Sequence, residues 1–336
     1  MLAKVLDWLG FGPHGHGQHD HDEGHTHGVV DPTIATTTRG IWALKWSFVI
    51  LAATAVLQVV VVYVSHSVAL LADTIHNIGD AGTAIPLWIA FLLARRKPTQ
   101  TFTYGYGRVE DFAGLAIVLI ILLSALVAGY QAIDRLIHPQ PVVQLGWLAA
   151  AGLIGFLGNE AVAVFRIRIG RQINSAALIA DGYHARTDGL TSLAVVLGAF
   201  GVWMGYPLAD PLVGLIITVV ILGIVWQSAK AVLTRMLDGV EPHVVSELRL
   251  AAQRARGVAS VDSVRARWLG HRLYGEMTLG VDPALSLADA RKVADDVTQY
   301  ARGHLPALER LLVEIVPGSG RERPEQHPEA EHQHHH

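Results

Sequence analysis

Two twelve-residue stretches, identical at six of their twelve positions, decide how this chain folds. Residues 69–80 are Ala-Leu-Leu-Ala-Asp-Thr-Ile-His-Asn-Ile-Gly-Asp, and residues 177–188 are Ala-Leu-Ile-Ala-Asp-Gly-Tyr-His-Ala-Arg-Thr-Asp. Alanine, leucine, alanine, aspartate, histidine and aspartate recur at the same offsets, 108 positions apart. Both stretches lie within long apolar segments, so the sequence indicates two related halves, each with ionisable residues inside an apolar span.

The composition around these stretches is that of a membrane protein. The chain has 336 residues, of which 51% are hydrophobic and 16% charged, whereas soluble domains usually carry about 25% charged residues. This excludes disorder, a secreted disulfide scaffold and most cytosolic enzymes. A net charge of −3 argues against nucleic acid as a partner. There is no cysteine but there are 18 histidines, so any metal chemistry rests on imidazole and carboxylate.

Six segments are apolar enough to cross the roughly 30 Å hydrocarbon core of a lipid bilayer as helices of about 20 residues. The repeated stretches fall in the second and fifth of these segments. Because the fifth span comes three spans after the second, the two stretches cross the membrane in opposite directions, as in inverted-topology transporters with a site near the membrane midplane. The predicted spans are 41–64, 68–94, 110–134, 144–166, 175–203 and 208–234.

The charge of the loops sets the predicted orientation. With the N-terminus inside, seven basic residues fall in inside loops and only Arg135 in an outside loop. This bias places both termini in the cytoplasm and the protein in the cytoplasmic membrane as a multi-pass protein. The inside residues are Arg95, Arg96, Lys97, Arg108, Arg166, Arg168 and Arg171.

The remaining sequence divides into tails and a second domain. Residues 1–38 form a His-rich tail predicted to be disordered, and residues 39–236 hold the six spans. Residues 237–317 have the order αββαβ, with Leu273, Met277, Leu279 and Val281 expected on one face of the second strand. Residues 318–336 are polar, contain histidine and are predicted to be disordered. The fold class is therefore an α-helical membrane protein followed by an α+β domain.

The repeated histidines and aspartates suit a metal site. His76 and Asp80 are four residues apart, as are His184 and Asp188, so each pair shares one helix face. Two imidazoles and two carboxylates make the four ligands of tetrahedral Zn²⁺. The alternative is two self-satisfied His–Asp hydrogen bonds that hold helices together, but such pairs do not require the same trio of residues twice.

Asp73 and Asp181 complete the repeated trio, three residues before each histidine. They lie on the same helix faces as the predicted ligands. Two roles stay open for them: support of the ligands or a water path to the site, and simple helix packing.

The chain resembles the cation diffusion facilitator family. The resemblance rests on six spans, a paired HxxxD motif in the second and fifth, the loop string Tyr-Gly-Tyr-Gly-Arg-Val-Glu at 104–110, and the trailing αββαβ domain. The His/Asp–His/Asp combination is similar to the zinc-transporting branch. It implies a homodimer that exports Zn²⁺ in exchange for protons, with Cd²⁺ and Co²⁺ as further candidate substrates, and a ferredoxin-like cytoplasmic domain. It also implies a dimer hinge, in which Arg108 pairs with Asp238.

The residues themselves suggest how protons enter the mechanism. Free histidine has a pKa of about 6.5, so His76 and His184 can carry either a proton or a metal at cellular pH. Metal binding requires neutral imidazole and ionised carboxylate, and therefore expels protons. A site open alternately to each side then couples the two fluxes.

Weaker signals lie outside the repeated stretches. The N-terminal histidines suggest a zinc collector that feeds the pore, and the alternative is a solvated tail with incidental metal affinity. In the cytoplasmic domain, His271 is the favoured candidate for a regulatory metal ligand. Arg186 is expected to extend toward the cytoplasmic surface, and Asn159 and Glu160 either line a polar path or face a neighbouring helix. The N-terminal candidates are His14, His16, His19, His21, His25 and His27.

Two other classes of function compete with transport. An intramembrane metalloenzyme needs an open position on its zinc, which four protein ligands would fill, and the chain has no HExxH motif. A membrane metal sensor needs an output segment, and nothing resembling one follows the αββαβ domain.

Overall fold

The computed structural model describes residues 32–65, 84–138 and 145–318, and these form two compact units. The first unit comprises residues up to Val240 together with the short segment Arg267–Leu273, and the second comprises Glu241–Ala266 and the chain from Tyr274 onward. The predicted ligands His76 and Asp80, the neighbouring Asp73 and the histidine-rich tails lie outside the described residues.

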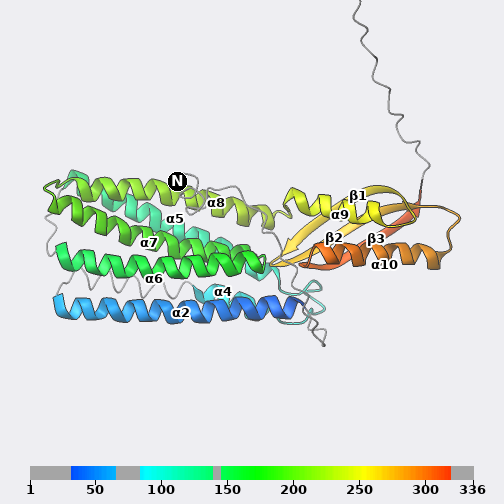
Figure 1. Ribbon diagram of the computed structural model, residues 1–336, viewed down its shortest axis with the longest axis horizontal. Coiled ribbons are helices and arrows are strands. Elements are labelled where there is room, and N and C mark those ends of the chain that lie inside the picture. Colours follow the sequence, from blue (N-terminus) through cyan, green and yellow to red (C-terminus); the bar gives the residue numbers. More distant parts are fainter. Residues whose placement is uncertain (1–31, 66–83, 139–144, 319–336) are drawn as a thin grey trace, which may run out of the picture. The chain divides into compact units, whose positions relative to one another are not determined.

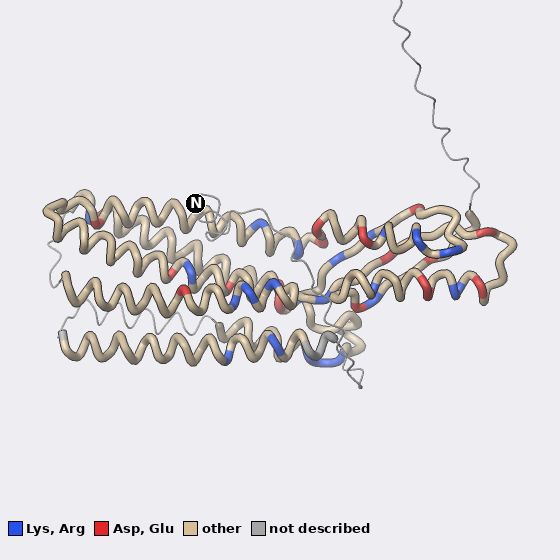
Figure 2. Tube along the Cα trace, in the orientation of Figure 1, with Lys and Arg blue, Asp and Glu red and all other residues tan. Residues whose placement is uncertain are grey.

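The first unit is a bundle of long helices (Figure 1). Figure 2 shows few charged residues along most of their length, as expected for segments whose backbone is satisfied internally and whose side chains face lipid. The apolar core is formed mainly by α2, α4, α5, α7 and α8, and includes Leu87, Phe91, Ile117 and Ile121. The helices are α2 (Pro32–Ser65), α4 (Ala84–Ala94), α5 (Arg108–Ile137), α6 (Leu145–Gln172), α7 (Ala176–Trp203) and α8 (Ala209–Met236).

Four helices among the described residues are long and apolar enough to span a membrane, namely α2, α5, α6 and α8. The described part of the second predicted span, α4, has 11 residues. Helix α7 has 28 residues, about 42 Å at 1.5 Å per residue, which is long enough to cross a bilayer. The predicted class of helical membrane protein with a small α+β domain is confirmed.

The boundaries of α6 correct one prediction. Arg166, Arg168 and Arg171 were expected in a loop, but α6 continues to Gln172 and includes all three. Arg166 is 2% exposed. A hydropathy boundary drawn at the first arginine ends the helix too early, because a buried arginine with a partner does not end a span.

The second unit contains α9 (Pro242–Arg254), α10 (Leu287–His304) and β3 (Leu308–Pro317), together with most of β1 (Val258–Leu269) and β2 (Arg272–Val281). The strand order is β1-β2-β3. Leu273, Met277, Leu279 and Val281 are all buried, which confirms the predicted inward face of β2. Ser286 caps α10, and its hydroxyl together with Lys292 lowers the pKa of the Asp289 carboxyl.

Candidate metal site and membrane interior

Helix α7 carries the described half of the predicted metal site. Its first turn follows a tight turn at Asn174, whose φ is +56°, and the hydroxyl of Ser175 accepts a hydrogen bond from the Leu178 N–H at 3.1 Å. Ser175 also donates to Glu110 Oε1 at 2.5 Å, which ties the start of α7 to α5. These contacts fix where α7 begins and therefore which residues reach the middle of the bundle.

His184 is buried in the bundle, close to Asp188. It is 1% exposed, and its Nδ1 lies 3.6 Å from Asp188 Oδ1, one turn further along α7. Within the described part of the chain, neither ring nitrogen of His184 has a hydrogen-bond partner. Burying a polar group without a partner is costly, so a ligand that accepts the imidazole lone pair would relieve this cost.

The structure describes only this half of the predicted four-ligand set. Among the described residues no group of three His, Cys, Asp or Glu side chains is close enough to hold a metal ion. The four-ligand site of His76, Asp80, His184 and Asp188 therefore stays a prediction.

Asp181, which was predicted to support the ligands, line a water path or pack helices, forms an ion pair with the buried Arg166 of α6. Its side chain is completely buried, and Arg166 Nη1 lies 2.9 Å from Asp181 Oδ2. The guanidinium compensates the carboxylate charge in the interior of the bundle. This contact ties Asp181 to α6.

Arg186 does not extend toward the cytoplasmic surface as the sequence suggested. It is 5% exposed and donates two hydrogen bonds to Glu160 of α6, from Nη2 to Oε1 at 2.7 Å and from Nε to Oε2 at 3.2 Å. Two parallel bonds of this kind are the strong arrangement for arginine and carboxylate. The choice left open for Glu160 is thereby settled in favour of a neighbouring helix.

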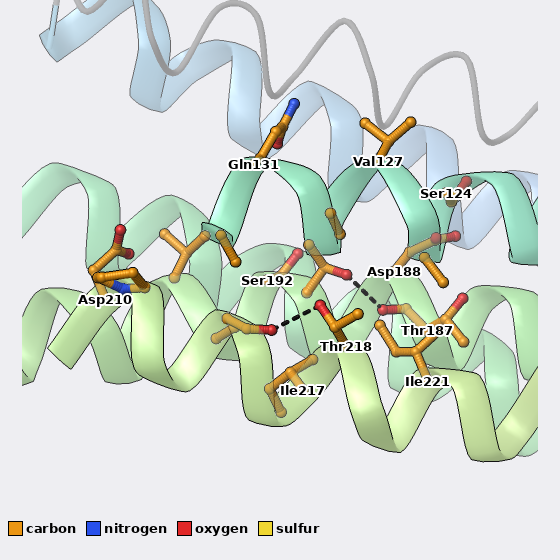
Figure 3. A pocket seen from close by; sticks show the side chains of 18 of the residues that line it. Ser124, Val127, Gln131, Thr187, Asp188, Ser192, Asp210, Ile217, Thr218 and Ile221 are labelled. Carbon is orange, nitrogen blue, oxygen red and sulfur yellow. Dashed lines mark hydrogen bonds between the residues drawn. The ribbon is translucent and has the colours of Figure 1, made fainter. Parts of the chain in front are cut away.

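A cavity of about 530 Å³, lined by both polar and apolar side chains, reaches Asp188 (Figure 3). It lies between α5, α7 and α8 and extends to Asp210 in the first turn of α8. Thr191 and Thr218 donate to carbonyls of their own helices, at 2.9 and 2.8 Å, so their oxygen lone pairs are available to the cavity. Its polar lining comprises Ser124, Gln131, Arg135, Thr187, Asp188, Thr191, Ser192, Asp210 and Thr218.

His271 is buried in the first unit, in the segment between β1 and β2, and both ring nitrogens already have partners. Nδ1 lies 2.7 Å from Glu110 Oε2 and Nε2 lies 3.0 Å from Thr37 Oγ1. Gly270, with φ +62°, makes the turn, and a Cβ there would lie 2.6 Å from Glu110 Oε2. The role of His271 as a regulatory metal ligand stays a prediction. Sequence reasoning missed this network, since an acid in the first turn of a helix is ordinary.

Arg108 and Asp238 form an ion pair, as the resemblance implied. Arg108 Nη1 also donates to the carbonyl of Arg235 at 3.0 Å and lies 3.5 Å from Asp111 Oδ2. The side chains of the pair are 33% and 49% exposed. Whether the pair acts as a dimer hinge stays a prediction.

Together these features define a class of protein. A bundle of membrane-spanning helices that buries a histidine and several charged residues, with a cavity that leads to a carboxylate, is the architecture of a membrane transport protein. The αββαβ unit that follows it has no span of its own among the described residues.

Comparison with known proteins identifies the family. Residues 44–237 match the cation efflux transmembrane domain, and residues 240–317 match the cytoplasmic domain of cation efflux proteins, a dimerisation domain that supports a homodimer. The chain belongs to the cation efflux, or cation diffusion facilitator, family. Its members are transporters, which sets aside the metalloenzyme alternative.

The names of individual relatives differ in the substrate that they state. The probable cation efflux system protein Rv2025c of Mycobacterium tuberculosis is 51% identical over 307 residues, covering 91% of this chain and 90% of that protein. The manganese efflux system protein MneS of Bacillus subtilis is 21% identical, covering 76% and 91%. Among solved structures, a C-terminal domain of MamM is 29% identical and covers 23% of this chain and 96% of that one, with a TM-score of 0.22.

Proposed function

We propose that this cation efflux protein exports Zn²⁺ from the cytoplasm in exchange for protons, with His76, Asp80, His184 and Asp188 as the four ligands. The observation that carries the proposal is the buried imidazole of His184, whose two nitrogens lack hydrogen-bond partners among the described residues, next to Asp188. The second half of the set follows from the repeated sequence at 69–80.

The ligand set favours Zn²⁺ over harder ions. Imidazole suits Zn²⁺, whereas carboxylate and water suit Mn²⁺, and four ligands match the tetrahedral preference of zinc. Cd²⁺ and Co²⁺ are the closest competitors. The name of MneS assigns manganese to a relative, so Mn²⁺ is the substrate that a test must separate from zinc.

Protons are the proposed counter-ion. A neutral imidazole can bind either a proton or a metal ion, and near neutral pH both compete for it. Alternating access of the site to the two sides of the membrane turns this competition into exchange.

The cavity between α5, α7 and α8 is the proposed path on one side of the site. It joins Asp188 to Asp210, and its hydroxyl and amide oxygens can replace part of the hydration shell of a cation along the way. With both termini in the cytoplasm, Asp210 and Arg135 are at the outer end of this path, so the cavity serves release. The proposed location is the cytoplasmic membrane.

Auxiliary roles for the N-terminal tail, for His271 and for the pair Arg108 and Asp238 complete the proposal. The histidines of the N-terminal tail collect zinc on the cytoplasmic side, and a regulatory metal at His271 would have to displace its hydrogen bonds to Glu110 and Thr37. The homodimer is hinged at Arg108 and Asp238 between the membrane and cytoplasmic parts.

Purified protein in proteoliposomes tests the proposal. Zinc uptake should rise when the vesicle interior is made more acidic than the bath, because outward proton flow then drives metal inward. A parallel panel of Cd²⁺, Co²⁺ and Mn²⁺ measures selectivity. His184→Ala should abolish zinc uptake, whereas His304→Ala, which changes an exposed histidine of α10, serves as the matched control. Uptake that ignores the pH gradient would contradict proton exchange, and faster Mn²⁺ than Zn²⁺ uptake would contradict the assigned substrate.

A further inference from the structure

Helices α6 and α7 are joined by two ion pairs inside the bundle. Arg166 pairs with Asp181, with side chains 3% and 0% exposed, and Glu160 pairs with Arg186, with side chains 16% and 6% exposed. The four charges play no part in the proposed ligand set. Ionisable residues inside a membrane span are costly and usually serve a function.

Close packing accompanies the two ion pairs. A Cβ at Gly182 would lie 3.0 Å from the backbone nitrogen of Ile167, and a Cβ at Gly152 would lie 2.9 Å from a methyl carbon of Val196. The helices are antiparallel, and these contacts and the ion pairs all belong to one alignment of α7 on α6. His184 lies between Asp181 and Arg186 in the sequence, within the segment that the ion pairs hold.

The order of the charges along the two helices favours the native alignment of α7 on α6 over alignments in which one helix has slid along the other. Along α6 the acid Glu160 precedes the base Arg166, and along α7 the acid Asp181 precedes the base Arg186. Because the helices are antiparallel, each acid faces a base. If α7 slid by the distance between its two charges, either two carboxylates or two guanidinium groups would come together. Five residues of helix correspond to about 7.5 Å.

We propose that the four residues of these two ion pairs are positioning residues for transport. In one pair the acid belongs to α6 and in the other to α7, so the pairs fix the depth of His184 and Asp188 in the membrane and make α6 and α7 move as one body. The inference rests on the proposed metal role of α7. It assigns the motion of transport to the contacts of α6 and α7 with other helices.

Exchanging the charges within an ion pair tests whether their order along the helices matters, or only that each buried charge has an opposite partner. Exchange within one pair, Glu160→Arg with Arg186→Glu, keeps both ion pairs but places two bases on α6 and two acids on α7, so a slid alignment is no longer repelled. Exchange within both pairs, which adds Arg166→Glu and Asp181→Arg, restores alternating polarity. We expect the single exchange to lower zinc flux by about tenfold, within the usual range of coupling between contacting residues, and the double exchange to recover it.

A cross-link reports the alignment directly. The chain has no cysteine, so Gly152→Cys with Val196→Cys introduces one pair. A Cβ at position 152 would lie 2.9 Å from Cγ2 of Val196, and Sγ of a cysteine at 196 can take this Cγ2 position, so that the two side chains can be joined by a disulfide. The native alignment gives the cross-link, the single exchange should reduce its yield, and the double exchange should restore it. Equal yield and equal flux in the two exchanges would overturn the proposal.

A second measurement uses native charges, in case the exchanged proteins fail to fold. The full-length Gly152→Cys, Val196→Cys protein is reconstituted in the oxidised and in the reduced form. If α6 and α7 move as one body, both forms transport zinc at the same rate. Loss of transport on oxidation, restored by a reductant, would overturn the proposal. Transport that persists in His184→Ala would instead refute the metal site and leave the cross-link result unchanged, so the two failures are distinguishable.

Discussion

Helix pairs α6–α7 and α5–α8 each carry two ion pairs, but in different places. In α6–α7 the pairs lie in the interior, and none of the four side chains is more than 16% exposed. In α5–α8 they lie at the two ends: Arg108 with Asp238, 33% and 49% exposed, and Arg135 with Asp210, 55% and 15% exposed. Exposed pairs contribute little to stability, whereas breaking a buried pair strands a charge.

The two helix pairs also differ in the order of their charges. Helix α5 provides both arginines of its pairs, and α8 with the residue soon after it provides both aspartates. A uniform order leaves the alignment of α5 and α8 to apolar packing, while the alternating order in α6–α7 specifies one alignment. The cavity that reaches Asp188 is bounded by α5 and α8 as well as α7, so the less constrained pair borders the proposed path.

The largest expected effect is on zinc transport, and it comes from removing a carboxylate of the proposed metal site. Asp188→Ala should abolish zinc transport and leave a folded dimer, because three ligands hold Zn²⁺ poorly, and Asp80→Ala should do the same. Proteoliposome uptake and size-exclusion chromatography measure the two properties. Asp295→Ala, at an exposed carboxylate of α10, is the control. Near-normal zinc flux in both site variants would refute the site.

The next effect concerns stability and compares the two helix pairs. Arg166→Leu leaves the completely buried Asp181 without its cation, which should cost about 3–5 kcal/mol. Arg135→Leu, on the pair at the helix ends whose arginine is 55% exposed, should cost less, about 1 kcal/mol. Thermal unfolding of the full chain in detergent measures both.

A second-site change checks the cause of this loss. Arg166→Leu combined with Asp181→Leu removes both charges and should recover most of the lost stability, because an apolar pair of similar size can replace a buried ion pair. If the double variant is as unstable as the single one, the loss comes from packing around Arg166 and not from the stranded carboxylate.

The sequence predicted the fold better than it predicted the partners of buried charges. Hydropathy and the αββαβ pattern gave the class of fold, and the repeated motif placed His184 and Asp188 on one helix face. The sequence did not reveal that Arg166 is part of α6 and buried in the bundle, or that Arg186 forms hydrogen bonds with Glu160. Periodicity tells which face of a helix a residue occupies, but the neighbour that covers this face depends on tertiary packing. The Glu110–His271 contact joins residues 161 positions apart, which no local pattern could indicate.

Substitution of one proposed ligand tests whether ligand chemistry or helix packing sets selectivity. His76→Asp should keep some zinc transport and raise cadmium transport relative to zinc, because a carboxylate can bind with both oxygens and accept a larger ion. Manganese should gain as well, since the ligand set becomes harder. Parallel uptake of the three metals measures this. Unchanged ratios, with all fluxes lowered equally, would mean that packing is the filter.

The same substitution predicts a change in pH dependence. Aspartate has an ordinary pKa of about 3.9 and histidine of about 6.5, so His76→Asp removes one group that competes with protons near neutral pH. The pH at which zinc exchange is half-maximal should therefore move downward. Asn at the same position is a useful comparison, because His76→Asn removes the titrating group without adding a carboxylate.

The smallest expected effect on stability is at the end of the α5–α8 pair, and it decides whether Arg108 and Asp238 are a hinge. Since both side chains are partly exposed, their coupling in the unfolding of the full chain should be about 1 kcal/mol or less. A hinge should nevertheless couple them in transport and in dimer formation. The double-mutant cycle of Arg108→Ala and Asp238→Ala compares the three measurements. Non-additive transport with nearly additive unfolding supports a hinge, because the pair then acts on motion rather than on stability. Additivity in all three would reduce the pair to two solvated charges.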